Sequence, residues 1–322
     1  MTKINMVQAI NQALRSEMTK DKSIVLMGED VGVDGGVFRV TEGLQKDFGE
    51  ERVIDTPLAE AGIIGTATGM AINGLKPIPE MQFSGFAYQA FHHFAQHLGE
   101  IRQRSNGTFS LPMVVRAPSG GGIHALEHHS ESPETFFIHA QGMKVVMPSG
   151  PYDAKGLLLA SIRDPDPVIF FEPKKIYRSF KEEVPDEEYV IELGKANVIK
   201  AGTDVTIVAW GAMVRLCQET LEKMPNVSAE LIDLRTLWPL DMETVLASVK
   251  KTGRVVIVQE APLALGLGSE IAAQLASKAI YHLKAPIERV ASLNIPFPQY
   301  ALEEYHLPDG VRLKNAIDTV LK

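Results

Sequence analysis

The chain has 322 residues, enough for two domains that each have a hydrophobic core. Hydrophobic residues make up 45% and charged residues 22%, a composition typical of a folded globular protein rather than a disordered one. The net charge of −8, without any basic cluster, argues against nucleic acid as a partner.

Cysteine content and the N-terminal residues bear on the compartment. The single cysteine, Cys217, rules out an internal disulfide framework and fits a reducing environment. The residues after Met1 lack the charged and then apolar pattern of a secretion signal. No apolar run approaches the ~18 residues that a membrane span needs. We therefore expect a cytoplasmic protein that does not enter the membrane.

Short β-branched runs alternate with helical patterns through the first half of the chain. Strands are predicted at residues 23–29, 52–56, 76–81, 112–117, 144–148 and 167–172. Helices are predicted near residues 5–19, 58–72, 86–104 and 151–162. Several strands are apolar on both faces, as in a sheet covered by helices on both sides. The pattern predicts an α/β domain with a doubly wound parallel sheet.

A charged segment that contains a proline, residues 180–192, interrupts this alternation and is the predicted linker. Beyond it, strands are predicted at 205–210, 229–234 and 255–260, and helices near 212–224, 240–250 and 269–281. The pattern predicts a second, smaller α/β domain. We expect the two domains to span residues 1–185 and 190–322.

A glutamate stands at the start of a glycine-rich helix in residues 55–74. Pro57 suits the first turn of this helix, and Glu60 follows at the carboxyl end of a strand, where open α/β sheets bind ligands. The helix and its end carry four glycines, each of which costs a helix interior roughly 1 kcal/mol. Such glycines indicate the close approach of another backbone. The alternative is that Glu60 only complements the helix dipole, which contributes about 0.3–1 kcal/mol.

A glycine-rich loop with three histidines follows the strand at 112–117. The loop begins at Gly120, and His124, His128 and His129 lie within ten residues of it. Histidine is the usual proton shuttle near neutral pH, and loops at strand ends often carry function. A metal site is the competing interpretation, but no cysteine or aspartate stands at ligand spacing.

Eight segments, taken together, resemble one family. They are GEDVG (28–32), DTPLAEAGIIGTATG (55–69), EMQFSGFAYQA (80–90), HHSESPETFFIHAQGMKVVMPSGPYDAKGLL (128–158), PVIFFEPKKIYR (167–178), DVTIVAWG (204–211), IDLRTLWPLD (232–241) and EAPLALGLGSEI (260–271). The chain resembles the beta subunit of the decarboxylating component of 2-oxoacid dehydrogenase complexes. HSESPETFF and IFFEPKKIYR are most similar to the branched-chain enzyme, and the pyruvate and acetoin enzymes remain open.

The resemblance implies a pyrimidine-binding domain, a transketolase C-terminal-type domain and thiamine diphosphate as cofactor. Glu60 matches the glutamate that hydrogen-bonds N1′ of the aminopyrimidine and so favours the imino tautomer, whose nitrogen removes the C2 proton. Phe86 matches the aromatic residue that packs on the pyrimidine, and Leu58 and Gln82 match its neighbours. His129 matches a histidine beside the thiazolium, with an expected role in acyl transfer to the lipoyl arm.

Two further acids and a cation site follow from the same resemblance. Glu29, in GEDVG, matches a residue near the buried path between two active sites. Glu80 is a weaker member of this acidic set, and either could be structural. Some members bind a potassium ion, and the matching positions here are Leu111, Met113, Ser161, Asp164 and Asp166. Asp166 replaces the usual asparagine of that site.

The diphosphate site is expected on another chain. Thiamine enzymes hold the diphosphate through Mg²⁺ with a GDG segment, and this sequence has none; the nearest string is VDGG at 33–36. The resemblance implies that an alpha subunit binds the diphosphate and Mg²⁺ in an α2β2 heterotetramer. This subunit is then expected to be inactive alone, with its glycine-rich helix packed at an interface.

The expected function is oxidative decarboxylation of a 2-oxo acid of the branched-chain type, with reductive acylation of lipoyl-lysine on an acyltransferase component. The alternatives are a pyruvate or acetoin dehydrogenase beta subunit, a split transketolase-type subunit and a non-catalytic assembly subunit. A sugar-phosphate site needs positive charge, and residues 120–141 contain no Lys or Arg. The presence of Glu60, Phe86 and His129 together argues against an assembly subunit.

Overall fold

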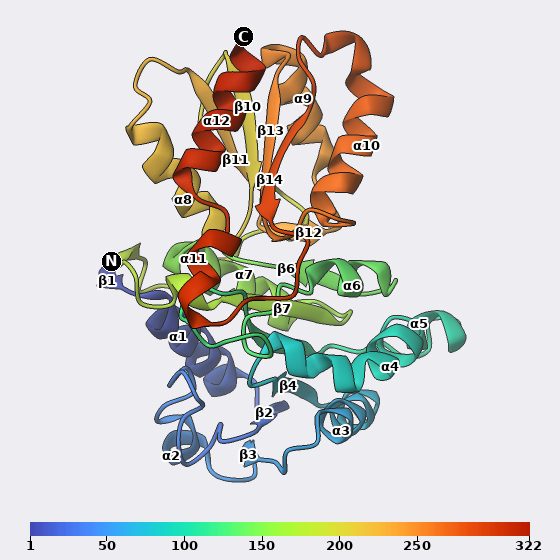
Figure 1. The fold of residues 1–322 in the computed structure, drawn as a ribbon. Coiled ribbons are helices and arrows are strands. Elements are labelled where there is room, and N and C mark those ends of the chain that lie inside the picture. Colours follow the sequence, from blue (N-terminus) through green and yellow to red (C-terminus); the bar gives the residue numbers. More distant parts are fainter.

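A computed structural model describes all 322 residues. The two halves of the chain each form an α/β unit around a central β-sheet (Figure 1). The first sheet has the strand order β12-β6-β7-β5-β4-β2-β3. Its strands are β2 (Ile24–Gly28), β3 (Val53–Asp55), β4 (Lys76–Glu80), β5 (Val114–Ser119), β6 (Lys144–Val146), β7 (Val168–Pro173) and β12 (Thr236–Trp238). All its pairings are parallel except that of β12 with β6.

Helices cover both faces of this sheet. One face packs against α1 (Met6–Lys20) and α7 (Pro151–Arg163), and the other packs against α3 (Glu60–Ile72) and α6 (Glu134–His139). Neighbouring strand residues serve opposite faces: Leu26 joins the α1 side and Met27 joins the α3 side. This alternation explains why β2 is apolar on both faces.

The second sheet has the order β14-β13-β10-β11-β9 and stands above the first in Figure 1. Its strands are β9 (Asn197–Lys200), β10 (Val205–Ala209), β11 (Ala229–Asp233), β13 (Val255–Pro262) and β14 (Glu288–Ser292). The helices α8 (Ala212–Glu222) and α12 (Gly310–Leu321) pack on one face, and α9 (Met242–Thr252) and α10 (Leu267–Ala279) pack on the other. The doubly wound α/β fold predicted from the sequence is confirmed. No helix combines the length and the apolar character that crossing a bilayer requires.

The helix predicted near 86–104 is wrong as a single element. It divides into η1 (Ser84–Ala90), α4 (Phe91–His93), a π-helical turn η2 (Phe94–Leu98) and α5 (Ile101–Arg104). The interruption between η2 and α5 coincides with a close backbone contact at Gly99, where an added Cβ would overlap the Gln141 carbonyl oxygen. Gly85, within η1, makes a similar approach, since a Cβ there would lie 2.7 Å from the His128 carbonyl oxygen. Tertiary contacts of the backbone therefore favour glycine at both positions.

The segment predicted as a linker is partly a strand. Within residues 180–192, β8 (Glu182–Val184) pairs antiparallel with β1 (Thr2–Ile4), and the Tyr189 ring stacks on Tyr152 at 4.5 Å between centroids. The chain also returns to the first sheet after residue 190, because β12 forms its edge strand. Small strands of this kind carry too few residues to show a period in the sequence. The boundaries 1–185 and 190–322 therefore stay a prediction.

Candidate functional site

The predicted catalytic and cofactor-binding residues gather at one edge of the first sheet. Glu29 follows β2, Glu60 opens α3, Gln82 and Phe86 follow β4, and His129 lies in the loop after β5. Because these strands are parallel, their carboxyl ends meet at one edge. The order in which strands are added to the sheet also reverses here, since β3 and β4 lie on opposite sides of β2. Such a switch point is where open α/β sheets bind ligands.

Glu60 is a buried carboxylate without a partner. It is 2% exposed, and neither carboxylate oxygen accepts a hydrogen bond. Its position as the first residue of α3 provides the favourable field of a helix N-terminus. Burying a carboxyl group without hydrogen bonds nevertheless lowers the stability of the folded protein. A bound ligand that donates a hydrogen bond to Glu60 would offset this cost. The geometry therefore fits a bound group that offers an N–H to this carboxylate.

Glu29 places a second acid next to Glu60. It is 6% exposed, and its Oε2 atom has no hydrogen-bond partner. Burial, followed by the negative charges of Glu60 and Asp30, raises the pKa of Glu29 to about 7. Near neutral pH this side chain exists in both protonation states, so it can exchange a proton with its surroundings.

Aromatic rings hold His129 against the same edge. The His129 ring lies edge-on to Phe83 at 4.4 Å and to Phe86 at 5.3 Å between centroids. Phe83 and Phe86 contact each other at 5.5 Å. Edge-to-face packing of this kind fixes ring orientation. The contact depends on Gly85, which has no side chain to separate η1 from the histidine loop.

The two remaining cofactor-pocket candidates lie at the rim. Gln82 Nε2 donates a hydrogen bond of 2.9 Å to Asp30 Oδ2, which ties the end of β4 to the end of β2. Leu58 lies between β3 and α3 with 72% of its surface exposed. Its apolar side chain is thus available to a ligand or another chain beside Glu60.

Glu80 belongs to a buried ion-pair network beneath this edge. The fully buried Arg116 pairs with Glu80 and also donates from Nε and Nη2 to Glu172 at 2.7 and 2.9 Å. The Tyr177 hydroxyl donates to Glu172 at 2.5 Å. Burial raises the pKa of Glu80, and the positive charge of Arg116 opposes that rise. With its carboxylate engaged in this way, Glu80 links strands β4, β5 and β7.

The candidate cation-site residues meet at the opposite, amino edge of the sheet. The carbonyls of Leu111, Met113 and Ser161 each accept a backbone hydrogen bond. Asp164 accepts a hydrogen bond of 2.8 Å from Lys144 Nζ, and Asp166 pairs with Arg102. Both carboxylates are thus already compensated by side chains of this protein. The potassium site stays a prediction.

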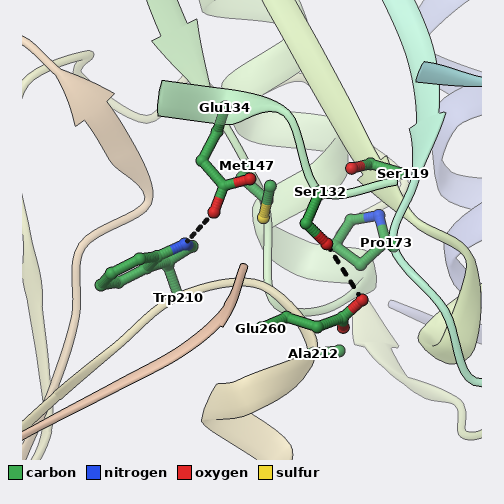
Figure 2. Close-up of a pocket in the computed structure, with 9 residues that line it drawn as sticks. Ser119, Ser132, Glu134, Met147, Pro173, Trp210, Ala212 and Glu260 are labelled. Atoms are coloured by element: carbon green, nitrogen blue, oxygen red, sulfur yellow. Dashed lines mark hydrogen bonds between the residues drawn. The ribbon is translucent and has the colours of Figure 1, made fainter. Parts of the chain in front are cut away.

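Two acids of the C-terminal half hold the histidine loop, and the sequence did not reveal them. Glu260 Oε1 accepts a hydrogen bond from the Gly121 N–H at 2.6 Å. It also accepts one from Ser132 Oγ at 3.2 Å, which Figure 2 shows. Glu303, in α11 (Glu303–His306), accepts from the Gly122 N–H at 2.6 Å. Their partners lie more than a hundred residues away, so no local spacing could have identified them.

A further hydrogen bond holds the C-terminal end of this loop, where α6 begins at Glu134. Trp210 Nε1 donates to Glu134 Oε1 at 3.3 Å, as Figure 2 shows. Burial raises the pKa of Glu134 to about 7. The loop that carries His129 is therefore held at both ends by the C-terminal half of the chain.

Two known domain families match this chain. The family described as "Transketolase, pyrimidine binding domain" matches residues 2–179, and "Transketolase, C-terminal domain" matches residues 194–313. A solved structure named "Split gene transketolase, inactive beta4 tetramer" superimposes with a TM-score of 0.77 over 99% of each chain. Its sequence is 23% identical, so this likeness concerns the fold alone.

Curated relatives are similar over almost their whole length. A protein of Acholeplasma laidlawii named "Pyruvate dehydrogenase E1 component subunit beta" is 52% identical to this chain. The alignment covers 99% of this chain and 98% of that protein. A protein of the same name from Staphylococcus epidermidis is also 52% identical, with 96% of each chain covered. With both halves matched in order, the chain belongs to the family of E1 component beta subunits of 2-oxoacid dehydrogenases.

Proposed function

We propose that this protein is the beta subunit of a pyruvate dehydrogenase E1 component that uses thiamine diphosphate. The observation that carries the proposal is the buried Glu60 carboxylate, which has no hydrogen-bond donor within the chain. The names of its 52% identical relatives support pyruvate as the substrate. They favour this alternative over the branched-chain type, which rested on two short motifs.

Substrate choice can be measured in the assembled enzyme. With an alpha subunit present, we expect kcat/KM for pyruvate to exceed that for branched 2-oxo acids by about tenfold or more, since each extra methylene shifts recognition by about 1–3 kcal/mol. A preference for branched acids would restore the branched-chain interpretation without changing the role of Glu60.

The residues of this chain have separate roles in the proposed reaction. Bound thiamine diphosphate would supply the electron sink for decarboxylation. Glu60 would hold a proton at the pyrimidine ring nitrogen, and Glu29 lies close enough to influence that proton electrostatically. Phe86 would offer an aromatic surface to the pyrimidine, and Leu58 and Gln82 would border it. His129, whose ring contacts Phe86, would move a proton when the acyl group leaves for a lipoyl acceptor.

Replacing His129 with Ala is expected to separate the two half-reactions. Reductive acylation of lipoamide should fall by about 10²–10⁴-fold, the usual contribution of a general acid or base, while decarboxylation should fall much less. Single-turnover decarboxylation and lipoamide reduction measure the two steps. His128→Ala is the matched control, since this neighbour is exposed and should retain both steps. Equal losses in both steps of His129→Ala would contradict the assignment.

We also propose an alpha subunit as partner, which would bind Mg²⁺ and the diphosphate, and a lipoyl-bearing acyltransferase as acyl acceptor. The α2β2 heterotetramer places the glycine-rich helix α3 at an interface. Within this chain only part of α3 needs its glycines: a Cβ on Gly65 would touch His93 at 3.4 Å, whereas one on Gly69 would meet nothing within 4 Å. The cytoplasmic location stays a prediction.

Gly69→Leu is expected to disrupt assembly and leave the subunit folded. The open space around Gly69 accommodates a side chain, and removing a helical glycine should stabilise the isolated helix by up to ~1 kcal/mol. At an interface the same side chain would hold two backbones apart. Sedimentation with the alpha chain measures assembly, and thermal unfolding measures the fold. Unchanged assembly of Gly69→Leu would exclude α3 from the interface.

A further inference from the structure

Lys174 is a buried lysine that the proposed reaction does not use. It follows β7 at the carboxyl edge of the first sheet and is 3% exposed. Its Nζ atom has no hydrogen-bond partner and lies 5.6 Å from the centre of the Phe83 ring. A buried ammonium without hydrogen bonds is as unusual as a buried carboxylate without them, so it calls for a physical explanation.

Three carboxylates, here called the seat carboxylates, act on Lys174: Glu131 of the histidine loop, Glu260 of β13 and Glu303 of α11. Glu260 and Glu303 are the acids that hold the loop by its backbone N–H groups. A cavity of about 120 Å³ is lined by Glu131, Glu260 and other polar groups, and it is large enough for water. Lys174 thus lies where the loop meets the C-terminal half, and two of its seat carboxylates line this cavity.

Residues 120–132 are connected with Lys174 through the seat carboxylates, since Glu131 belongs to this loop and the N–H groups of Gly121 and Gly122 donate to the other two. We call the loop seated when these two hydrogen bonds are formed. A loop lifted from Glu260 and Glu303 would open the surroundings of Lys174 to water and hydrate its ammonium group. Seating also places His129, because its ring packs on Phe83, over which Lys174 lies.

We propose that Lys174 is a positioning residue for His129, which it influences by making the seating of the 120–132 loop depend on its own charge. The inference deepens the proposed function, on which the role of His129 rests. It concerns a proton on the Lys174 amine and requires no other chemistry.

The sign of the effect follows from proton linkage. Burial lowers the pKa of Lys174 to about 7, and the attraction of Glu260, Glu303 and Glu131 opposes but does not cancel that shift. In the lifted state the hydrated amine has the ordinary pKa of about 10.4. The seated state therefore binds fewer protons between these two values, and seating becomes more favourable as pH rises through that window. Below about pH 7 both states are charged, and the dependence ends.

Hydrogen exchange of the full chain, without cofactor or substrate, tests this directly. The reporters are the amides of Gly121 and Gly122, which donate to two of the seat carboxylates. In the unaltered protein, their protection factors should rise by about tenfold or more between about pH 7 and pH 9. A flat protection profile over this range would overturn the proposal without any variant.

Variants separate charge from packing. Lys174→Met retains the apolar stem without the charge, so loop protection near pH 7 should exceed that of the unaltered protein by about tenfold and lose its pH dependence. Lys174→Arg stays charged, so protection should stay low throughout. Lys181→Met, at an exposed lysine, is the control and should follow the unaltered protein. Protection in β5 and β7 confirms that each variant folds.

The activity readout distinguishes the two proposals. In the assembled enzyme, acyl transfer to lipoamide should increase with pH above about pH 7 and lose that increase in Lys174→Met. If exchange behaves as expected but acyl transfer does not respond, the loop seating stands and the role of His129 fails. If Lys174→Met exchanges like the unaltered protein at every pH, the positioning role of Lys174 fails, whatever the activity.

Discussion

Glu60→Gln is expected to abolish proton exchange at C2 of thiamine diphosphate while the protein remains folded. The amide has nearly the same shape but cannot hold the ionisable proton that the pyrimidine nitrogen must share. We expect a loss of about 10²–10⁴-fold, the range for a positioned acid or base. The exchange rate of the C2 proton, followed by NMR in the assembled enzyme, measures this step apart from substrate binding and acyl transfer.

Glu60→Gln is also expected to leave the stability of the protein unchanged or to increase it. Because Glu60 is buried and lacks a partner, its amide variant should unfold at the same or a higher denaturant concentration, with a gain of about 1 kcal/mol. A variant that is more stable but inactive is expected where a side chain is needed for function although it destabilises the fold. Glu51→Gln, at an exposed glutamate, is the control and should change neither property. C2 exchange at the original rate in Glu60→Gln would remove the assigned role.

Arg116→Met is expected to cause a large loss of stability. Arg116 is fully buried between Glu80 and Glu172, so its removal leaves two carboxylates of low exposure without a cation. Breaking such a buried pair typically costs about 3–5 kcal/mol. Urea unfolding, followed by circular dichroism, measures the free energy of unfolding.

Two comparisons separate charge from shape in this network. Arg104→Met breaks an exposed pair with Glu100 and should cost less than about 1 kcal/mol. Adding Glu80→Gln and Glu172→Gln to Arg116→Met removes the stranded charges and should recover much of the loss. No recovery would indicate that the guanidinium acts through packing rather than charge.

The architecture could be predicted because the buried strands of a doubly wound sheet leave a strong pattern. Runs such as 24–28 and 168–171 are apolar on both faces, and β2 and β7 form there. Helix α12 also had a signal that was missed: Leu313, Ala316, Ile317 and Val320 are buried along one face after an Asp309 cap. The edge strands β1, β8 and β12 could not be predicted, because each forms by antiparallel pairing with a distant segment of the chain.

The candidate site could be predicted in part. The strand-end rule located Glu60 and the histidine loop, and the family resemblance added Phe86 and His129. The burial of the Glu60 carboxyl group without a hydrogen-bond partner could not be predicted from the sequence, since it depends on how α3 packs against β4 and η1. Lys174 carries no local signal either. Its environment is assembled from residues 131, 260 and 303, which only the fold brings together.

Complementation with an alpha subunit tests whether this chain holds only the pyrimidine side of a thiamine diphosphate site. The purified chain should show no decarboxylation of pyruvate with thiamine diphosphate and Mg²⁺, and adding the alpha chain should produce activity that depends on both. Glu60→Gln should assemble equally well and remain inactive. Thiamine-dependent activity of this chain alone, or full activity of the assembled Glu60→Gln variant, would contradict the account.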